Sequence, residues 1–481
     1  MKRILLALLT VILVVVIVVL FKTFTLKSRQ ISFTPLPATP PSESAVQHLS
    51  NAIQYKTISY GDSTKLDTAA FLGLHRFLQR AYPLVHSKLT LTKVAKYSLM
   101  FEWKGSREDV RPAIFMAHQD VVPVEEEVVS HWKVEPYAGT VKDGFVWGRG
   151  TADDKINLIA MLETVETLLS KGYAPVRTLF LCFGHDEEMG GSGAAAIARF
   201  LSERGVQADI VLDEGGIVTK EKVPGMKAPV ALIGTSEKGY MTVSLSVEKN
   251  GGHSSMPETE TSIDILTKAI TRLRDHPFDS RFSPSTEGFM RNLGPEMPFV
   301  NRMAFANPWL FTPMIKSIYE KSAAGNAMIR TTLVPTILDA GVKDNVIPTR
   351  AEAYINMRLL PGDSSHFALA EVRRIINDDR VQVSVESQFI HEPSAVTDEN
   401  SYAYQVVNEA AKRAFDNVAT SPFLMIGATD SRHFAKVSTG IIKFSPMIDP
   451  EGFHGIDERV SLEGYGRALL FYNELITIIN R

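Results

Sequence analysis

Acidic side chains follow a predicted buried strand in the first half of the chain. Residues 178–193 read T-L-F-L-C-F-G-H-D-E-E-M-G-G-S-G, so an unbroken apolar run ends in Asp186, Glu187 and Glu188. Such a run is typical of a strand that is buried on both faces of a parallel sheet. In open α/β sheets, ligands bind at the carboxyl ends of the strands. The three carboxylates therefore indicate either a cation site or a solvated acidic turn.

Two further predicted strands end in similar residues. The apolar residues 113–117 precede His118 and Asp120, and another short apolar run ends at Asp213 and Glu214. Alternate residues of an extended segment point the same way, so His118 and Asp120 can act as a pair. A metal-binding imidazole usually donates its second N–H to a carboxylate. Three strands that end in acid or histidine at one sheet edge favour the cation site over the solvated turn.

A glycine-rich segment, W-G-R-G-T-A-D-D-K, adds Asp153 and Asp154 before a predicted helix at residues 156–170. The glycines permit a tight turn, and helix capping is an alternative role for one of the aspartates. Histidine with several carboxylates and no thiolate suits zinc, cobalt or manganese. More carboxylates than one ion can use favour two metals that share a bridging ligand. A further histidine ligand could come from His454, in a late F-H-G segment.

The motifs occur in the order found in a known family. They are the His-x-Asp, the G-R-G-T-x-D-D-K, the Glu-Glu pair, the D-E-G-G, a G-G-H-S-S and the F-H-G. The chain resembles the di-zinc metallopeptidases and amidohydrolases that include aminoacylase, glutamate carboxypeptidase and carboxypeptidase S. The resemblance covers roughly residues 45–481. Within that family, the long anchored form is most similar to the group of carboxypeptidase S and the N-fatty-acyl-amino-acid synthase/hydrolase.

The resemblance implies two Zn²⁺ ions per chain, with Co²⁺ or Mn²⁺ as substitutes. Asp153 would bridge the two ions. His118 and Asp213 would complete one metal site. Glu188 and His454 would complete the other.

The resemblance also implies roles for the neighbouring residues. Glu187 would be the general base, and Asp120 would orient His118. Asp154 and Glu214 would cap or support the site without binding a metal.

The fold class expected from the pattern and the resemblance is α/β. A zinc-peptidase-like catalytic domain with a mixed, mainly parallel sheet would be interrupted by a ferredoxin-like α+β lid domain. The lid would span residues 238–390, where strands and helices follow the order β-α-β-β-α-β once an insert at 276–327 is removed. Its last strand is expected at 381–388. The catalytic domain would then comprise residues 45–237 and 391–481.

Three lid residues resemble substrate-binding positions of the family. They are His253, which in dimers reaches the site of the neighbouring subunit, Asn345 and Arg358. A surface arginine is the alternative for Arg358, but arginine binds a carboxylate bidentately, which favours the substrate role.

The family's lid often pairs two subunits, which implies a homodimer through the lid. The aromatic insert departs from the compact pattern and argues against that dimer. It is expected to build a small core against the lid, with an acyl or side-chain pocket as the alternative.

The N-terminus reads as a membrane segment. Residues 4–21 are apolar apart from Thr10 and are long enough to cross a bilayer. No small-x-small cleavage site follows, so residues 1–29 are expected to be an uncleaved anchor rather than a removed signal peptide. Basic residues on both flanks leave the orientation ambiguous, and an exported body (periplasmic, lumenal or extracellular) is the commoner arrangement. The proline-rich residues 30–44 are expected to form a semi-rigid linker.

Composition excludes some classes of function. The net charge of −3 over 481 residues provides no basic footprint, so no nucleic-acid partner is expected. Cys182 is the only cysteine, which excludes an intrachain disulfide, and its apolar surroundings predict a buried, inert thiol.

The function expected from these features is zinc-dependent hydrolysis of an amide bond next to a free carboxylate. The enzyme would be a carboxypeptidase or an N-acyl-amino-acid amidohydrolase, and the reaction could be reversible. A di-zinc aminopeptidase or dipeptidase is one alternative, against which Arg358 argues, because an aminopeptidase recognises an amine. A non-catalytic binding relative is another, against which the full set of competent side chains argues.

Overall fold

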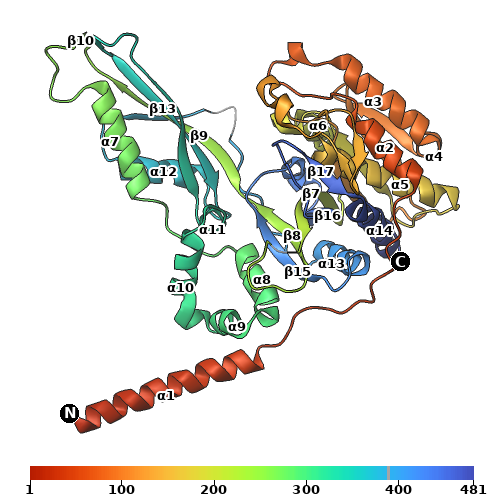
Figure 1. Cartoon of the computed structure of the whole chain (residues 1–481), viewed down its shortest axis with the longest axis horizontal. Helices are drawn as coiled ribbons and strands as arrows, with labels where there is room; N and C mark the ends of the chain where they lie inside the picture. The colour runs from red at the N-terminus through yellow and green to blue at the C-terminus, as the bar shows by residue number, and fades with distance from the viewer. Residues whose placement is uncertain (221, 387–389) are drawn as a thin grey trace.

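The computed structural model describes residues 1–220, 222–386 and 390–481. Figure 1 shows a catalytic domain, a lid domain on the other side of the molecule, and a long N-terminal helix that projects away from both.

The catalytic domain is built on an eight-stranded sheet. Its order is β1 (Thr90–Val94), β2 (Ser98–Trp103), β6 (Leu179–Gly184), β3 (Ala113–His118), β7 (Ile210–Thr219), β16 (Ile441–Ile448), β8 (Val230–Glu237) and β15 (Ala419–Met425). The central strands β6, β3, β7 and β16 are parallel, and antiparallel pairings occur on both sides of them. The predicted mixed, mainly parallel sheet is confirmed.

Helices cover both faces of this sheet. One face carries α2 (Glu43–Ile53), α3 (Thr68–Ala81), α4 (Pro83–Lys88), α5 (Ile156–Ser170), α13 (Tyr402–Ala414) and α14 (Leu462–Ile479), and the other carries α6 (Ser192–Glu203) and the short helical segment Asp430–Lys436. Successive side chains of β6 point to opposite faces of the sheet. Leu181 lies in the core on one face and Cys182 in the core on the other. Because both faces are covered, the whole strand is apolar. Cys182 is buried as expected, and burial raises the pKa of its thiol.

A small sheet connects two distant loops of the site. It contains β4 (Thr140–Lys142), β5 (Phe145–Trp147) and β17 (Arg459–Ser461), and Trp147 pairs with Arg459. The glycine-rich segment begins directly after β5, and β17 follows the loop that contains His454. This pairing therefore brings the two loops to the same place.

The lid is a separate four-stranded antiparallel sheet. Its elements are β9 (Gly239–Glu248), α7 (Ser262–Asp275), β11 (Thr332–Ala340), β13 (Arg350–Leu359), α12 (Ser365–Ile376) and β14 (Gln382–Val385). The strand order β11-β13-β9-β14 is that of a ferredoxin-like domain. At the tip, β10 (Gly252–His253) pairs with β12 (Val346–Ile347). The predicted last strand, 381–388, includes residues 387 and 388, which lie outside the described residues.

The insert forms four helices. They are α8 (Pro284–Leu293), α9 (Phe299–Ala306), α10 (Pro308–Glu320) and α11 (Ala323–Ile329). Phe289 and Leu293 of α8 share a core with Val230 of β8 and Ala419 of β15. Phe278, at the start of the insert, does join the lid core, but the apolar face of α8 covers the edge of the catalytic sheet, so the expected core against the lid is only partly formed.

The N-terminal helix α1 (Lys2–Thr25) is followed by a segment that is bound to the body. The Gln30 side chain donates to the Asn292 and Thr420 carbonyls at 3.1 and 3.0 Å, and its oxygen accepts from the Lys412 ammonium at 2.9 Å. The Leu36 N–H donates to the Arg413 carbonyl. These contacts hold the predicted semi-rigid linker against the catalytic domain, so it is not a free spacer.

Candidate active site

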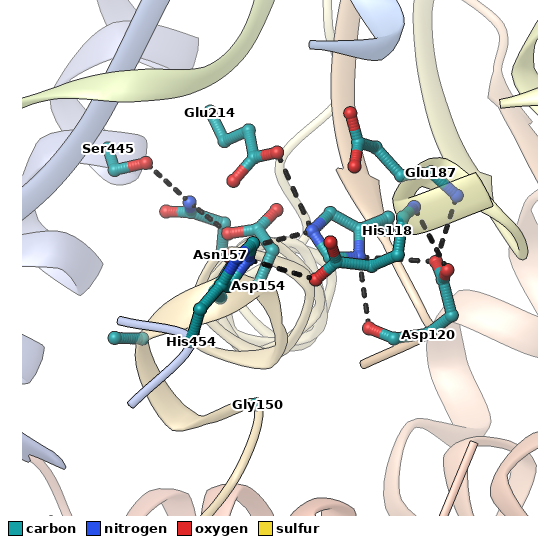
Figure 2. Close-up of polar contacts among 12 residues, drawn as sticks. His118, Asp120, Gly150, Asp154, Asn157, Glu187, Glu214, Ser445 and His454 are labelled. Atoms are coloured by element: carbon teal, nitrogen blue, oxygen red, sulfur yellow. Dashed lines mark hydrogen bonds and ion pairs between the residues drawn. The ribbon is translucent and has the colours of Figure 1, made fainter. Parts of the chain in front are cut away.

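Polar side chains from five segments meet at the carboxyl edge of the catalytic sheet (Figure 2). They come from the ends of β3 and β6, from β7, from the loop before α5 and from the loop before β17. Because the central strands are parallel, their carboxyl ends lie at one edge, as the sequence predicts.

Asp153 lies at the centre of this group. Its Oδ1 is 2.8 Å from His118 Nε2, and its Oδ2 is 2.9 Å from His454 Nε2. Glu188 Oε1 lies 3.4 Å from the same His454 nitrogen. Each carboxylate oxygen of Asp153 therefore faces a different histidine, which is the arrangement that a bridging ligand requires.

His118 is held in place by Asp120. Its Nδ1 lies 3.2 Å from Asp120 Oδ1 and 3.0 Å from the Asp120 carbonyl. The Asp120 carboxylate also accepts the Glu187 and Glu188 N–H groups and the Ser59 hydroxyl. Burial alone would lower the pKa of His118, but the facing carboxylates hold it well above its usual value. Asp120 thus connects the histidine to the Glu-Glu pair.

Glu458 fixes the loop that carries Asp153. Its buried carboxylate accepts the Gly150, Ala152 and Asp153 N–H groups at 3.0, 2.8 and 3.2 Å. It also forms a buried ion pair with Arg149, with 2.6 Å between nitrogen and oxygen. Sequence reasoning missed Glu458, although it lies only four residues after His454.

The structure brings Glu214, and not Asp213, to the histidine. Glu214 Oε1 lies 3.5 Å from His118 Nε2, whereas Asp213 accepts the Glu214 and Ser431 N–H groups at 2.9 and 2.7 Å. Neighbouring strand residues point to opposite faces, so only one of the two can face the site. Of these two neighbours, Glu214 is the one that faces His118, whereas the resemblance implied Asp213 as the ligand and Glu214 as a support.

Glu187 occupies a half-buried position beside the metal-ligand candidates. Burial and the nearby charge of Asp430 raise its pKa well above its usual value. Arg432 Nη1 lies 3.7 Å from Glu187 Oε1 and donates to the Thr429 carbonyl at 2.9 Å. Arg432 and Asp430 belong to the G-A-T-D-S-R segment at residues 427–432, which the structure places at the site.

Asp154 has a supporting position. It is buried and accepts a hydrogen bond from Asn157, which in turn donates to Ser445. Burial raises the pKa of Asp154 well above its usual value.

The residues present fit a pair of divalent cations. His118, Asp153 and Glu214 offer one cluster of ligand atoms, and Asp153, Glu188 and His454 offer another that shares Asp153. Nitrogen and carboxylate donors of this kind suit zinc, cobalt or manganese. In the part of the chain that the structure describes, the buried Glu188 Oε1 has no hydrogen-bond partner. Cations would also neutralise the crowded carboxylates.

Arg358 lies at the end of the lid that joins the catalytic domain. It pairs with Tyr240 across β13 and β9, and its guanidinium lies 4.8 Å from the Tyr240 ring centre. Burial and the positive charge of Arg432 lower its pKa. Two arginines, one from each domain, therefore lie close enough to influence each other, and Arg432 is the one beside Glu187.

His253 and Asn345 lie at the opposite end of the lid. His253 is on β10, which pairs with β12, and the Asn345 carbonyl accepts the Ser254 N–H. Figure 1 shows β10 at the far tip of the lid. The structure brings these two residues together but not to the metal-ligand candidates of the same chain.

Comparison with known proteins identifies the family. The profile of peptidase family M20/M25/M40 matches residues 114–478. The chain is 39% identical to probable carboxypeptidase S-like 2 of Dictyostelium discoideum, over 89% of this chain and 84% of that protein. It is 40% identical to the human N-fatty-acyl-amino acid synthase/hydrolase PM20D1, over 89% of this chain and 86% of that protein.

A solved structure shows the same fold. The M20 family metallo-carboxypeptidase Sso-CP2 from Sulfolobus solfataricus superposes with a TM-score of 0.66 at 18% identity, over 92% of this chain and 100% of that one. The predicted family, fold class and hydrolase class are confirmed. The chain belongs to peptidase family M20/M25/M40 and is a metallohydrolase of that family.

Proposed function

We propose that this chain hydrolyses the amide bond of an N-acyl amino acid or peptide next to a free carboxylate, with two zinc ions bound at the edge of the catalytic sheet. The observation that supports it most is the position of Asp153, whose two carboxylate oxygens face His118 and His454. The similarity to a carboxypeptidase S-like protein and to an N-fatty-acyl-amino acid synthase/hydrolase supports the substrate class. The same site would also catalyse the reverse condensation.

The metal ligands in this proposal are Asp153 between both ions, His118 with Glu214 on one side, and Glu188 with His454 on the other. Glu214 takes the ligand role that the sequence assigned to Asp213. Cobalt or manganese would serve as substitutes. When bound, the ions supply a water of lowered pKa and polarise the amide carbonyl.

The protein's own residues move the protons and hold the substrate. Glu187 accepts the proton of the attacking water and transfers it to the leaving nitrogen. Arg358, half-buried against Tyr240, binds the substrate carboxylate, and Arg432 lies beside Glu187. Asp120 keeps the His118 ring in one orientation.

A substrate panel tests this proposal. It compares dipeptides, short N-acyl and long N-acyl amino acids, each with a free and an amidated carboxylate. Substrates with the free carboxylate should be cleaved and their amides barely touched. Arg358→Ala should reduce kcat/KM by roughly 10- to 200-fold on the free acids only, because one charge-assisted hydrogen bond is lost. An equal fall in kcat/KM on the free acids and on their amides would show that Arg358 does not bind the substrate carboxylate.

We further propose that α1 anchors the chain in a membrane with the catalytic domain exported. The helix is long and apolar enough to cross a bilayer, and 6% of its most apolar window is buried in the molecule. A reporter fused after Arg481 should be active only in the exported compartment, and the protein should resist carbonate extraction. A soluble product shortened near residue 25 would show that the segment is a cleaved signal.

A further inference from the structure

The last turns of α1 pack on the start of the insert helices. The buried Asn307 side chain, between α9 and α10, donates to the Val19 carbonyl at 3.2 Å and to the Thr23 hydroxyl at 3.3 Å. Arg302 of α9 donates to the Leu26 carbonyl at 2.6 Å. Figure 1 shows α9 beside the C-terminal part of α1. The insert is therefore the part of the body that lies next to the anchor.

The position of this contact along α1 sets its depth in a bilayer. Residues 4–21 rise about 27 Å as a helix, close to the thickness of about 30 Å of a hydrocarbon core. The contact begins at Val19, near the end of this run, and continues beyond it: the Lys22 ammonium lies 5.9 Å from the Trp309 ring centre, and the Phe24 and Phe299 rings are 5.7 Å apart. Tryptophan and lysine are typical of the membrane–water interface. The starts of α9 and α10 would therefore lie at that interface.

An apolar row continues from this contact along α10. Leu310, Met314 and Ile318 follow at a spacing of four residues, which places them on one face of the helix. They are 41%, 44% and 58% exposed. We call these three residues the α10 row. Exposed apolar side chains that gather in this way mark interaction or membrane surfaces.

The α10 row leads to an apolar cavity. Met314 and Ile318 form part of its wall, and Phe289 of α8 and Phe423 of β15 form another part. The cavity has a volume of about 520 Å³, and aliphatic and aromatic side chains make up most of its lining. This volume falls in the usual range of small-molecule sites, and an apolar cavity takes apolar groups. It lies between the insert and the catalytic sheet, apart from the residues of the active site.

We propose that this cavity binds an acyl chain of a membrane lipid, which leaves the bilayer along the α10 row. The argument is the continuity of apolar surface from α1 through Trp309 and the α10 row into the cavity. The inference rests on the proposed membrane anchoring and not on the proposed amide hydrolysis. A bound acyl chain would fix the catalytic domain at the membrane at a second point besides α1.

Photo-labelling tests this proposal on the full chain in lipid nanodiscs. The probe is a phosphatidylcholine with a diazirine at the end of one acyl chain, and labelled positions are mapped by mass spectrometry. We expect labels on α10 and on the cavity wall around Phe289 and Phe423, besides those on α1. Met314→Asp with Ile318→Asp should reduce labelling of the cavity wall, relative to that of α1, by roughly tenfold or more, because two buried contacts with the chain are replaced by charges.

A matched control variant replaces two exposed apolar residues by aspartate on the lid. Ile337→Asp with Leu338→Asp on the lid strand β11 replaces two side chains that are 57% and 61% exposed and lie away from α1. This variant should leave the labelling pattern unchanged. Labels confined to α1 and α10, or a cavity-wall signal that the α10 variant does not reduce, would overturn the proposal.

Two measurements on the same sample keep this test separate from the proposed function. The intact mass shows whether α1 is retained, and hydrolysis of an N-acyl amino acid shows whether the active site works. An anchored, active protein without cavity labels would overturn the acyl-chain site alone. Cavity labels in an inactive protein would support that site and count against the proposed hydrolysis. A chain that has lost α1 would overturn the anchor and the lipid site together.

Discussion

The edge of the catalytic sheet and the tip of the lid both carry residues predicted for the active site, but they differ in how those residues are held. At the edge, Asp120 and Asp153 each have several partners, and His118 is buried between them, although His454 is exposed. At the tip, His253 is exposed and contacts Ser255. The residues proposed to bind the metals and to transfer protons therefore all come from one chain, whereas His253 and Asn345, two of the residues predicted to contact the substrate, lie away from them.

The geometry of the lid explains this division. Strand β13 runs from Arg350, near the tip, to Leu359 at the base, which corresponds to about 30 Å in an extended strand. Arg358 is at the base and can serve the site of its own chain. His253 and Asn345 would need a movement of the lid or a second chain to reach an active site.

The largest expected effect comes from removing the bridging carboxylate. Asp153→Ala should lose both metal ions, because Asp153 belongs to both ligand clusters. Activity should fall by more than the roughly 10²–10⁴-fold that loss of a general base costs. Metal content by elemental analysis and hydrolysis rates measure the two losses. The matched control is Asp154→Asn, whose buried carboxyl group has a raised pKa and bonds to Asn157. Retention of both metals in Asp153→Ala would contradict the bridge.

The next effect separates the two members of the Glu-Glu pair. Glu187→Gln keeps the shape of the side chain but cannot accept a proton, so turnover should fall by about 10²–10⁴-fold while metal stays bound. Glu188→Gln should instead lower metal occupancy, since Glu188 lies in the cluster with His454. Turnover and metal content are measured on both variants. If the two results are exchanged, the assignment of base and ligand is wrong by one residue.

A mixing experiment tests the division between edge and tip. His253→Ala and Glu187→Gln should each be inactive or strongly impaired alone. If His253 serves the site of a partner, mixed subunits contain one active site with neither change, so part of the activity should return on mixing. The rate of N-acyl amino acid hydrolysis before and after subunit exchange measures it. No recovery in a sample that forms mixed dimers would place the action of His253 within its own chain.

Much of the active site could be predicted because local patterns determine it. A buried strand that ends in acid or histidine identifies the sheet edge, and parallel strands bring such ends together. His118 and the Glu-Glu pair were predicted in this way, and Asp153 was predicted from the glycine-rich segment before α5. The choice between Asp213 and Glu214 was not accessible, because a one-residue difference reverses the face of a strand and the flanking sequence is apolar on both sides.

Long-range packing was the other part that the sequence did not reveal. The aromatic residues of the insert predict a core, but they do not show that Phe289 packs on β8 and β15 instead of the lid. The proline-rich segment predicts a spacer, but one side chain, Gln30, binds it to the catalytic domain. Glu458 was missed for a similar reason, since its partners lie about 300 residues earlier in the chain.

Replacement of Glu458 is expected to have the smallest effect of these variants, and it tests one specific contact. Glu458→Gln keeps the size of the side chain but removes the charge that pairs with Arg149 and accepts three N–H groups of the loop before α5. Because that loop positions Asp153, metal affinity should fall by about 10–100-fold, as for other residues that orient metal ligands. Competition with a chelator of known affinity measures the change. Glu463→Gln is the matched control, because this glutamate is exposed and forms an ion pair with Lys220 on the surface. Unchanged metal affinity in Glu458→Gln, with Arg149 still buried, would show that the loop holds Asp153 without this carboxylate.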